Sequence, residues 1–102
     1  MVTTSEAQQR AMMYLETIEL MLHDLPEVTA ECDSLSAGEQ TGWSMDWGNE
    51  MSGLQALSRW VSEGALEPKQ VKRYKRILAG LRDVIHLVDR LALRRPPAEL
   101  LA

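Results

Sequence analysis

Residues 68–93 read PKQVKRYKRILAGLRDVIHLVDRLAL, and this stretch decides the fold. Its apolar residues recur in alternating steps of three and four, which is the spacing of one face of a helix. Ile77, Val84 and Leu91 lie beside this seam and widen it enough to contact two neighbouring helices. The stretch therefore predicts one long helix within a bundle. The seam consists of Val71, Tyr74, Leu78, Leu81, Ile85, Val88 and Ala92.

The ends of this helix are marked by residues with special backbone preferences. Gly64 favours the end of a preceding helix, because glycine adopts a positive φ at little cost. Pro68 suits the first position of a helix, where its missing N–H is not needed. Pro96 and Pro97 prevent further helix. Only a short connection then separates the helix over about 68–93 from the one before it, so the two are predicted to be antiparallel neighbours.

The N-terminal part of the chain predicts two consecutive helices, over about 5–24 and 25–33. The sequence Asp24-Leu25-Pro26-Glu27 has a cap residue followed by an acid in the first turn, which favours a new helix at this point. A kinked continuation of the first helix across Pro26 is the alternative. The apolar stripe of the first helix consists of Ala11, Leu15, Ile18, Leu22 and Leu25, broadened by Met12, Tyr14 and Met21.

The middle of the chain predicts a loop and then a third helix. Residues 34–42 are mostly Ser, Gly and Thr and are typical of a loop. Ser44 is a suitable N-cap, so the next helix is predicted over about 44–63, with Trp47 and Trp60 in the core. No strand-like alternation is present. The sequence thus predicts a single all-α domain over residues 1–102, an antiparallel three-helix bundle with one short extra helix.

The composition is that of an ordinary globular protein, with 45% apolar and 25% charged residues. Cys32 is the only cysteine, so no intramolecular disulfide forms and a reducing compartment is expected. The N-terminus lacks the layout of a signal peptide, and no apolar run approaches the length of a membrane span. We therefore expect a soluble, cytoplasmic protein with no membrane partner.

Charge is divided unequally along the chain. Residues 1–67 carry twelve acids against two arginines, whereas residues 68–102 carry nine bases against three acids. Bases four residues apart on a helix repel each other, and the start of a helix favours anions instead. A negative group is therefore expected to compensate the first turns of the helix over 68–93. The bases concerned are Lys69, Lys72, Arg73, Lys75 and Arg76.

Two sources of this negative charge lead to different functions. Acids of the earlier helices, such as Glu16, Glu19, Glu27 and Glu31, would compensate the bases within or between subunits. An external partner would be either a protein with an acidic surface or a nucleic acid. Binding to nucleic-acid phosphates weakens steeply as the salt concentration rises, which distinguishes that case.

The first helix is apolar on two sides, which predicts a second contact surface. Met13 and Leu20 lie opposite its core stripe, and Met21 adjoins that stripe. We expect these three residues to form part of the interface of a homodimer. Trp43 precedes the predicted helix over 44–63 and is expected to anchor a partner, because aromatic side chains often dominate interfaces.

His23 and His86 are the residues that suggest chemistry near neutral pH. Metal-binding helical bundles place several ligands inward, often in a Glu-x-x-His pattern, and the sequence lacks this pattern. We therefore predict no metal, cofactor or catalytic residue, and expect both histidines on polar faces. The leading prediction is a small non-enzymatic protein-interaction or regulatory module. The second is a nucleic-acid-associated regulator, and the third is a small metal or catalytic protein that uses the two histidines.

Overall fold

The computed structural model describes residues 3–101, and these residues form helices and connections without any strand. The prediction of an all-α fold is therefore confirmed. The elements are α1 (Thr4–Glu31), the 3-10 turn η1 (Cys32–Ser34), α2 (Ala37–Ser62), α3 (Pro68–Asp83), α4 (Ile85–Arg90) and α5 (Ala98–Leu101).

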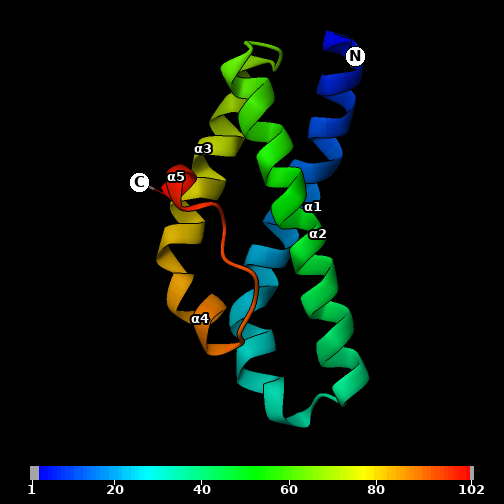
Figure 1. The fold of residues 1–102 in the computed structure, drawn as a ribbon, viewed down its shortest axis with the longest axis vertical. Coiled ribbons are helices and arrows are strands. Elements are labelled where there is room, and N and C mark those ends of the chain that lie inside the picture. Colours follow the sequence, from blue (N-terminus) through cyan, green and yellow to red (C-terminus); the bar gives the residue numbers. More distant parts are fainter. Residues whose placement is uncertain (1–2, 102) are drawn as a thin grey trace.

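Helix α1 packs against both α2 and α3 in an elongated molecule of 43 × 26 × 19 Å. In Figure 1, α1 and α3 run downward and α2 runs upward. The chain turns at α4, near the lower end of α1. Residues 91–97 then pass upward between α2 and α3, and α5 lies on α3. The C-terminal segment therefore fills the space between two helices instead of extending beyond the bundle.

The core is built on the predicted stripe of α1. Ala11, Leu15, Ile18 and Leu25 are at most 1% exposed. Trp47 and Trp60 of α2 are also buried, as predicted. Trp47 Nε1 donates a hydrogen bond of 2.8 Å to the carbonyl oxygen of Arg94, which satisfies the one polar group that burial of the indole would otherwise isolate.

The predicted separate helix over 25–33 is wrong, because α1 continues through Pro26 to Glu31. A proline inside a helix loses one backbone hydrogen bond and crowds the preceding turn. The pyrrolidine ring of Pro26 is exposed, however, while Leu25 and Thr29 on the adjoining part of α1 are buried. Burial of this side of the helix offsets the cost of the proline, so the alternative of a continued helix holds.

The predicted loop over 34–42 and the predicted N-cap Ser44 are also wrong, because α2 begins at Ala37. The N-cap is Ser36, whose side chain accepts a hydrogen bond from the backbone N–H of Glu39. The Glu39 side chain accepts one in return from the backbone N–H of Ser36. This capping box pairs two backbone donors and supports a helix start despite the glycines that follow.

The single helix predicted over 68–93 is divided in the structure. Its start is confirmed, since Gly64 has φ of 70° and Pro68 is the first residue of α3. Helix α3 ends at Asp83, however, and α4 follows after Val84. The break turns the chain back over the core, where Val88, Leu93 and Pro96 become buried. A straight helix would have carried the last two away from α1 and α2.

Two helical glycines predict opposite effects of an added methyl group. A Cβ at Gly53 would lie 2.5 Å from Cδ1 of Tyr14, whose ring stacks on Trp60 with centroids 6.2 Å apart. Gly53→Ala should therefore lower the free energy of unfolding by about 1–3 kcal/mol through overpacking. A Cβ at Gly80 would meet only Leu22 Cδ1, at an ordinary 3.5 Å. Gly80→Ala should raise the same quantity by about 0.5–1 kcal/mol.

Urea denaturation of both variants beside the wild-type protein measures these changes. Each variant is the control for the other, since both add one methyl group to a helix. Equal stability of the two variants would contradict the packing described for Tyr14.

Candidate functional site

The five bases of the first turns of α3 differ in their surroundings. Lys69, Lys72, Lys75 and Arg76 are exposed, whereas Arg73 is partly buried. No ion pair joins any of the four exposed bases to a carboxylate within residues 3–101. Of the five predicted residues, Arg73 is therefore partly buried within the fold, and the other four lie on the surface.

Arg73 is compensated by α1. Its guanidinium contacts Glu19 through two hydrogen bonds, from Nη2 to Oε1 at 2.5 Å and from Nε to Oε2 at 3.3 Å. The hydrogen bond with Glu19 raises the pKa of Arg73, partly opposed by burial, and the charges of Glu19 and Glu16 raise it further. This pair joins α3 to α1. For Arg73, it is the compensation by an acid of an earlier helix that the sequence predicted.

A second pair of contacts fixes the start of α3. Gln70 is buried and donates a hydrogen bond of 2.9 Å to the carbonyl oxygen of Gln8. Gln8 in turn donates one of 3.2 Å to the carbonyl oxygen of Ala65. The side-chain oxygen of Gln70 also accepts a hydrogen bond from the backbone N–H of Glu67, which caps the helix. The first turns of α3 are therefore joined to α1 by hydrogen bonds.

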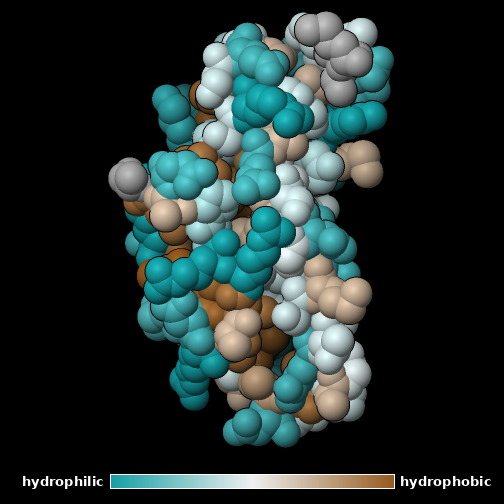
Figure 2. Space-filling view, in the orientation of Figure 1, coloured by the Kyte–Doolittle hydropathy of each residue, from teal (hydrophilic) through white to brown (hydrophobic). Residues whose placement is uncertain are grey.

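A groove of about 500 Å³ lies on the outside of these turns, and we call it the lysine groove. Leu66, Pro68 and Val71 provide apolar lining. Figure 2 shows apolar surface in brown among hydrophilic residues in teal on the α3 side of the molecule. The bases were predicted from the sequence, but this apolar lining was missed. Leu66 and Pro68 precede or begin the helix, so no periodicity reveals them. The charged residues of the groove are Lys69, Lys72 and Lys75.

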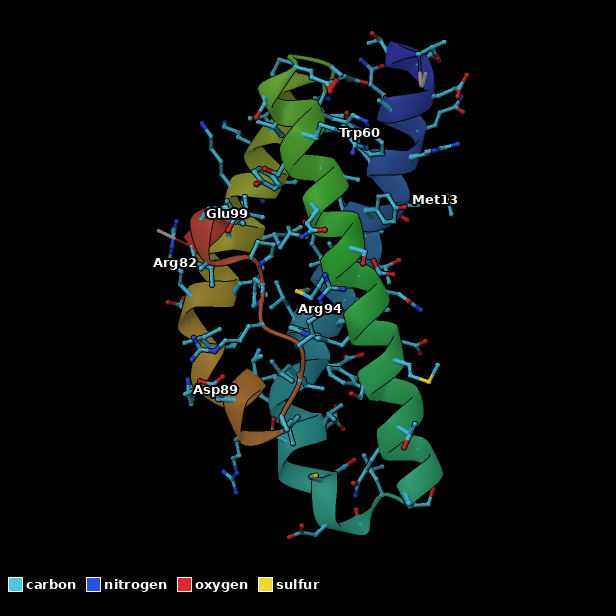
Figure 3. The ribbon with its side chains drawn as sticks, viewed as in Figure 1. Met13, Trp60, Arg82, Asp89, Arg94 and Glu99 are labelled. Atoms are coloured by element: carbon cyan, nitrogen blue, oxygen red, sulfur yellow. The ribbon has the colours of Figure 1, made fainter. Side chains whose placement is uncertain are left out.

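The predicted dimer residues fall into two groups. Met13 and Leu20 are 69% and 59% exposed on α1. In Figure 3, the side chain of Met13 points away from the other helices. Met21 belongs to the core instead, because its position on α1 turns it toward α2. Met12 and Met45 are also exposed, although Met12 was expected to broaden the core stripe.

The predicted anchor Trp43 lies within α2, not before it, because α2 begins earlier than expected. Its ring is half-buried and stacks on Trp47, with centroids 5.6 Å apart. Trp43 also lines a small pocket of about 50 Å³ with Cys32 and Leu93. Its ring is therefore held mainly by the fold.

His23 and His86 are both exposed. Nδ1 of His23 lies 3.3 Å from Oδ1 of Asp24, its neighbour on α1, and no hydrogen bond links the two histidines in the described chain. Across residues 3–101, no three His, Cys, Asp or Glu side chains gather in a way that would hold a metal ion.

An acidic groove between α1 and α2 contains Asp46 and Glu50. Oε2 of Glu50 is buried and has no hydrogen-bond partner among residues 3–101. Burial raises the pKa of Glu50 above its ordinary value of 4.5, and the nearby charge of Asp46 raises it further. An ionised Glu50 is therefore a source of instability in the fold. The other residues of this groove are Thr17, Met21, Trp43 and Asn49.

The raised pKa of Glu50 predicts how Glu50→Gln changes stability with pH. A carboxyl with a raised pKa favours folding below pH 4.5, and this contribution is lost as the pH rises through the raised pKa. Glutamine stays neutral, so the variant should match the wild type near pH 4 and exceed it at pH 7. Solvent screens a partly exposed group, so the gain is about 0.5 kcal/mol or less.

Urea denaturation at a series of pH values between about 4 and 7 measures this gain. Glu27→Gln, at an exposed glutamate of α1, controls for the loss of one negative charge. A gain that is the same at every pH would contradict the assignment to Glu50 ionisation.

No protein-family model, curated protein or solved structure shows significant similarity to this chain. Within residues 3–101, no helix combines the length and the apolar character needed to cross a membrane. The described chain has three candidate binding surfaces, which are the lysine groove, the exposed side of α1 and the acidic groove.

Proposed function

We propose that this chain is a small, non-enzymatic protein-interaction module that binds an acidic protein surface in the lysine groove of α3. One observation carries this proposal. Three lysines surround an apolar lining, and no carboxylate of the described chain pairs with them. The same groove thus offers both charge and apolar area to a partner.

The energetics of α3 favour an external anion. Like charges three or four residues apart destabilise a helix by a few tenths of a kcal/mol per pair, about 0.2–0.5. The positive end of the helix dipole adds to this at Lys69 and Lys72. Carboxylates of a partner would relieve both effects, and their long-range attraction would speed association. The apolar lining would add the water-excluding contact that gives such a complex its lifetime.

The platform for this groove is rigid. We propose that α1, α2 and α3 act as an antiparallel three-helix bundle, in which the paired Arg73 and the buried Gln70 hold the groove in one shape. A surface that is already ordered loses little conformational entropy on binding. This supports a docking role for α3 without a large rearrangement.

Nucleic-acid binding is the second candidate. It is favoured by the four basic side chains that have no carboxylate partner within residues 3–101, which are Lys69, Lys72, Lys75 and Arg76. Phosphates would use the charges of the groove but gain little from Leu66, Pro68 and Val71. An acidic protein partner therefore explains both the charged and the apolar residues of the groove, whereas nucleic acid explains only the charged ones.

The combined variant Lys69→Gln/Lys72→Gln/Lys75→Gln tests the proposal. Fluorescence anisotropy with labelled polyglutamate should show binding to the wild type that weakens at least about tenfold in this variant. Helix content should be retained, because the substitutions remove repulsion. The matched control is Arg10→Gln/Arg59→Gln/Arg90→Gln, which changes the net charge equally at exposed positions outside the groove.

Random duplex DNA is the competing probe. If the protein ignores polyglutamate at low salt, the interaction-module proposal fails. DNA could instead bind more tightly than polyglutamate, with an affinity that falls steeply with salt and a salt dependence that is lost in the triple lysine variant. Nucleic-acid binding would then replace the interaction-module proposal.

The exposed side of α1 supports a further proposal, that the chain forms a homodimer. Met13 and Leu20 are seven residues apart and lie on one face of the helix, exposed well beyond the usual degree for such side chains. Met13→Glu/Leu20→Glu should convert a dimer to a monomer without loss of helix content, as seen by light scattering after size exclusion. A monomeric wild-type protein would refute the dimer.

A further inference from the structure

Helix α5 packs on α3, so the chain itself already places a short helical segment on this helix. Glu99 of α5 is exposed, while Leu100 and Leu101 are half-buried against the core. Nε of Arg82 donates a hydrogen bond of 3.2 Å to the carbonyl oxygen of Leu101. A leucine-bearing segment therefore binds α3 through apolar side chains and through a hydrogen bond from a basic side chain to its backbone.

The lysine groove lies on the same side of α3 as this contact. Val71, Lys75, Leu78 and Arg82 follow one another in steps of four, three and four, which places them on a single stripe of the helix. Val71 and Lys75 belong to the groove, and Arg82 binds α5. Two residues of the groove thus lie on the first half of a stripe whose second half contacts α5.

We propose that the partner presents an acidic helix with leucine-type side chains, which lies in the lysine groove as α5 lies on the next part of α3. This inference rests on the proposed function and specifies its partner. Lys69 and Lys75 are six residues apart, a rise of about 9 Å, or nearly two helical turns. Acids at positions i, i+3 or i+4, and i+7 of the partner would follow this length. Its leucines would cover Leu66, Pro68 and Val71.

Two labelled peptides of equal charge test this partner. The first is an amphipathic helix with leucines at three-four spacing between glutamates, and the second has serine in place of every leucine. Binding to the full chain is measured by fluorescence anisotropy. The leucine peptide should bind at least about tenfold more tightly, which corresponds to burial of roughly one leucine side chain. Salt should weaken both peptides.

Protein variants separate the two parts of the groove. Val71→Ser should weaken the leucine peptide by about fivefold and leave the serine peptide unchanged. The triple lysine variant should weaken both peptides. Circular dichroism shows whether Val71→Ser disturbs folding. If it does, Pro68→Ala replaces it as the test of the apolar lining, because Pro68 lines the groove at an exposed position. Arg10→Gln should change neither affinity.

The failures of the two proposals differ. Equal binding of both peptides, lost in the triple lysine variant, would overturn the leucine-bearing helix and leave the acidic partner intact. Binding that depends on neither Val71 nor the lysines would overturn the inference, because the peptide would occupy another surface. Absence of binding by both peptides and by polyglutamate would overturn both proposals together.

Discussion

Burial of one side of α1 is the interaction on which the rest of the structure depends. Both α2 and α3 pack against this helix, and four residues of its stripe are almost inaccessible to solvent, namely Ala11, Leu15, Ile18 and Leu25. The same burial explains why α1 tolerates Pro26, since a break there would have withdrawn Leu25 and Thr29 from the core. Polar contacts then set the orientation of α3, through the ion pair of Arg73 with Glu19 and the buried Gln70.

This arrangement neutralises one basic residue at the start of α3 and leaves the others on the surface. Arg73 points toward α1 and is neutralised there, whereas the bases on the outer side of α3 have no carboxylate partner within residues 3–101. The outer bases lie around an apolar lining that comes partly from the turn before α3. Charge and apolar surface thus meet in the lysine groove. The contacts of Arg73 and Gln70 with α1, on the opposite side of α3, hold this part of the helix in position.

Gly64 and Pro68 were sufficient to predict the start of α3. Periodicity in the sequence was sufficient to predict the helical class and most of the core stripe of α1, of which Leu22 is only half-buried. It failed where local and tertiary effects compete. Gly38 and Gly42 suggested a loop, but the Ser36 and Glu39 capping box starts α2 before them. The break at Val84 has no local signal, because it depends on contacts that Leu93 and Pro96 make after the turn. The bases of the groove were visible in the sequence, while its lining depended on how the turn at Leu66 folds.

The path of residues 91–97 has a consequence for synthesis of the chain. Leu93 and Pro96 enter the core, and Trp47 of α2 binds the carbonyl oxygen of Arg94, a contact between residues 47 positions apart. Arg94 also donates hydrogen bonds to the carbonyl oxygen of Gly48 and to Ser52. Residues 91–97 therefore complete a core whose first helices lie much earlier in the sequence. Folding of this domain must wait until these residues have left the ribosome, and a nascent chain that ends before residue 91 leaves the indole of Trp47 without this partner.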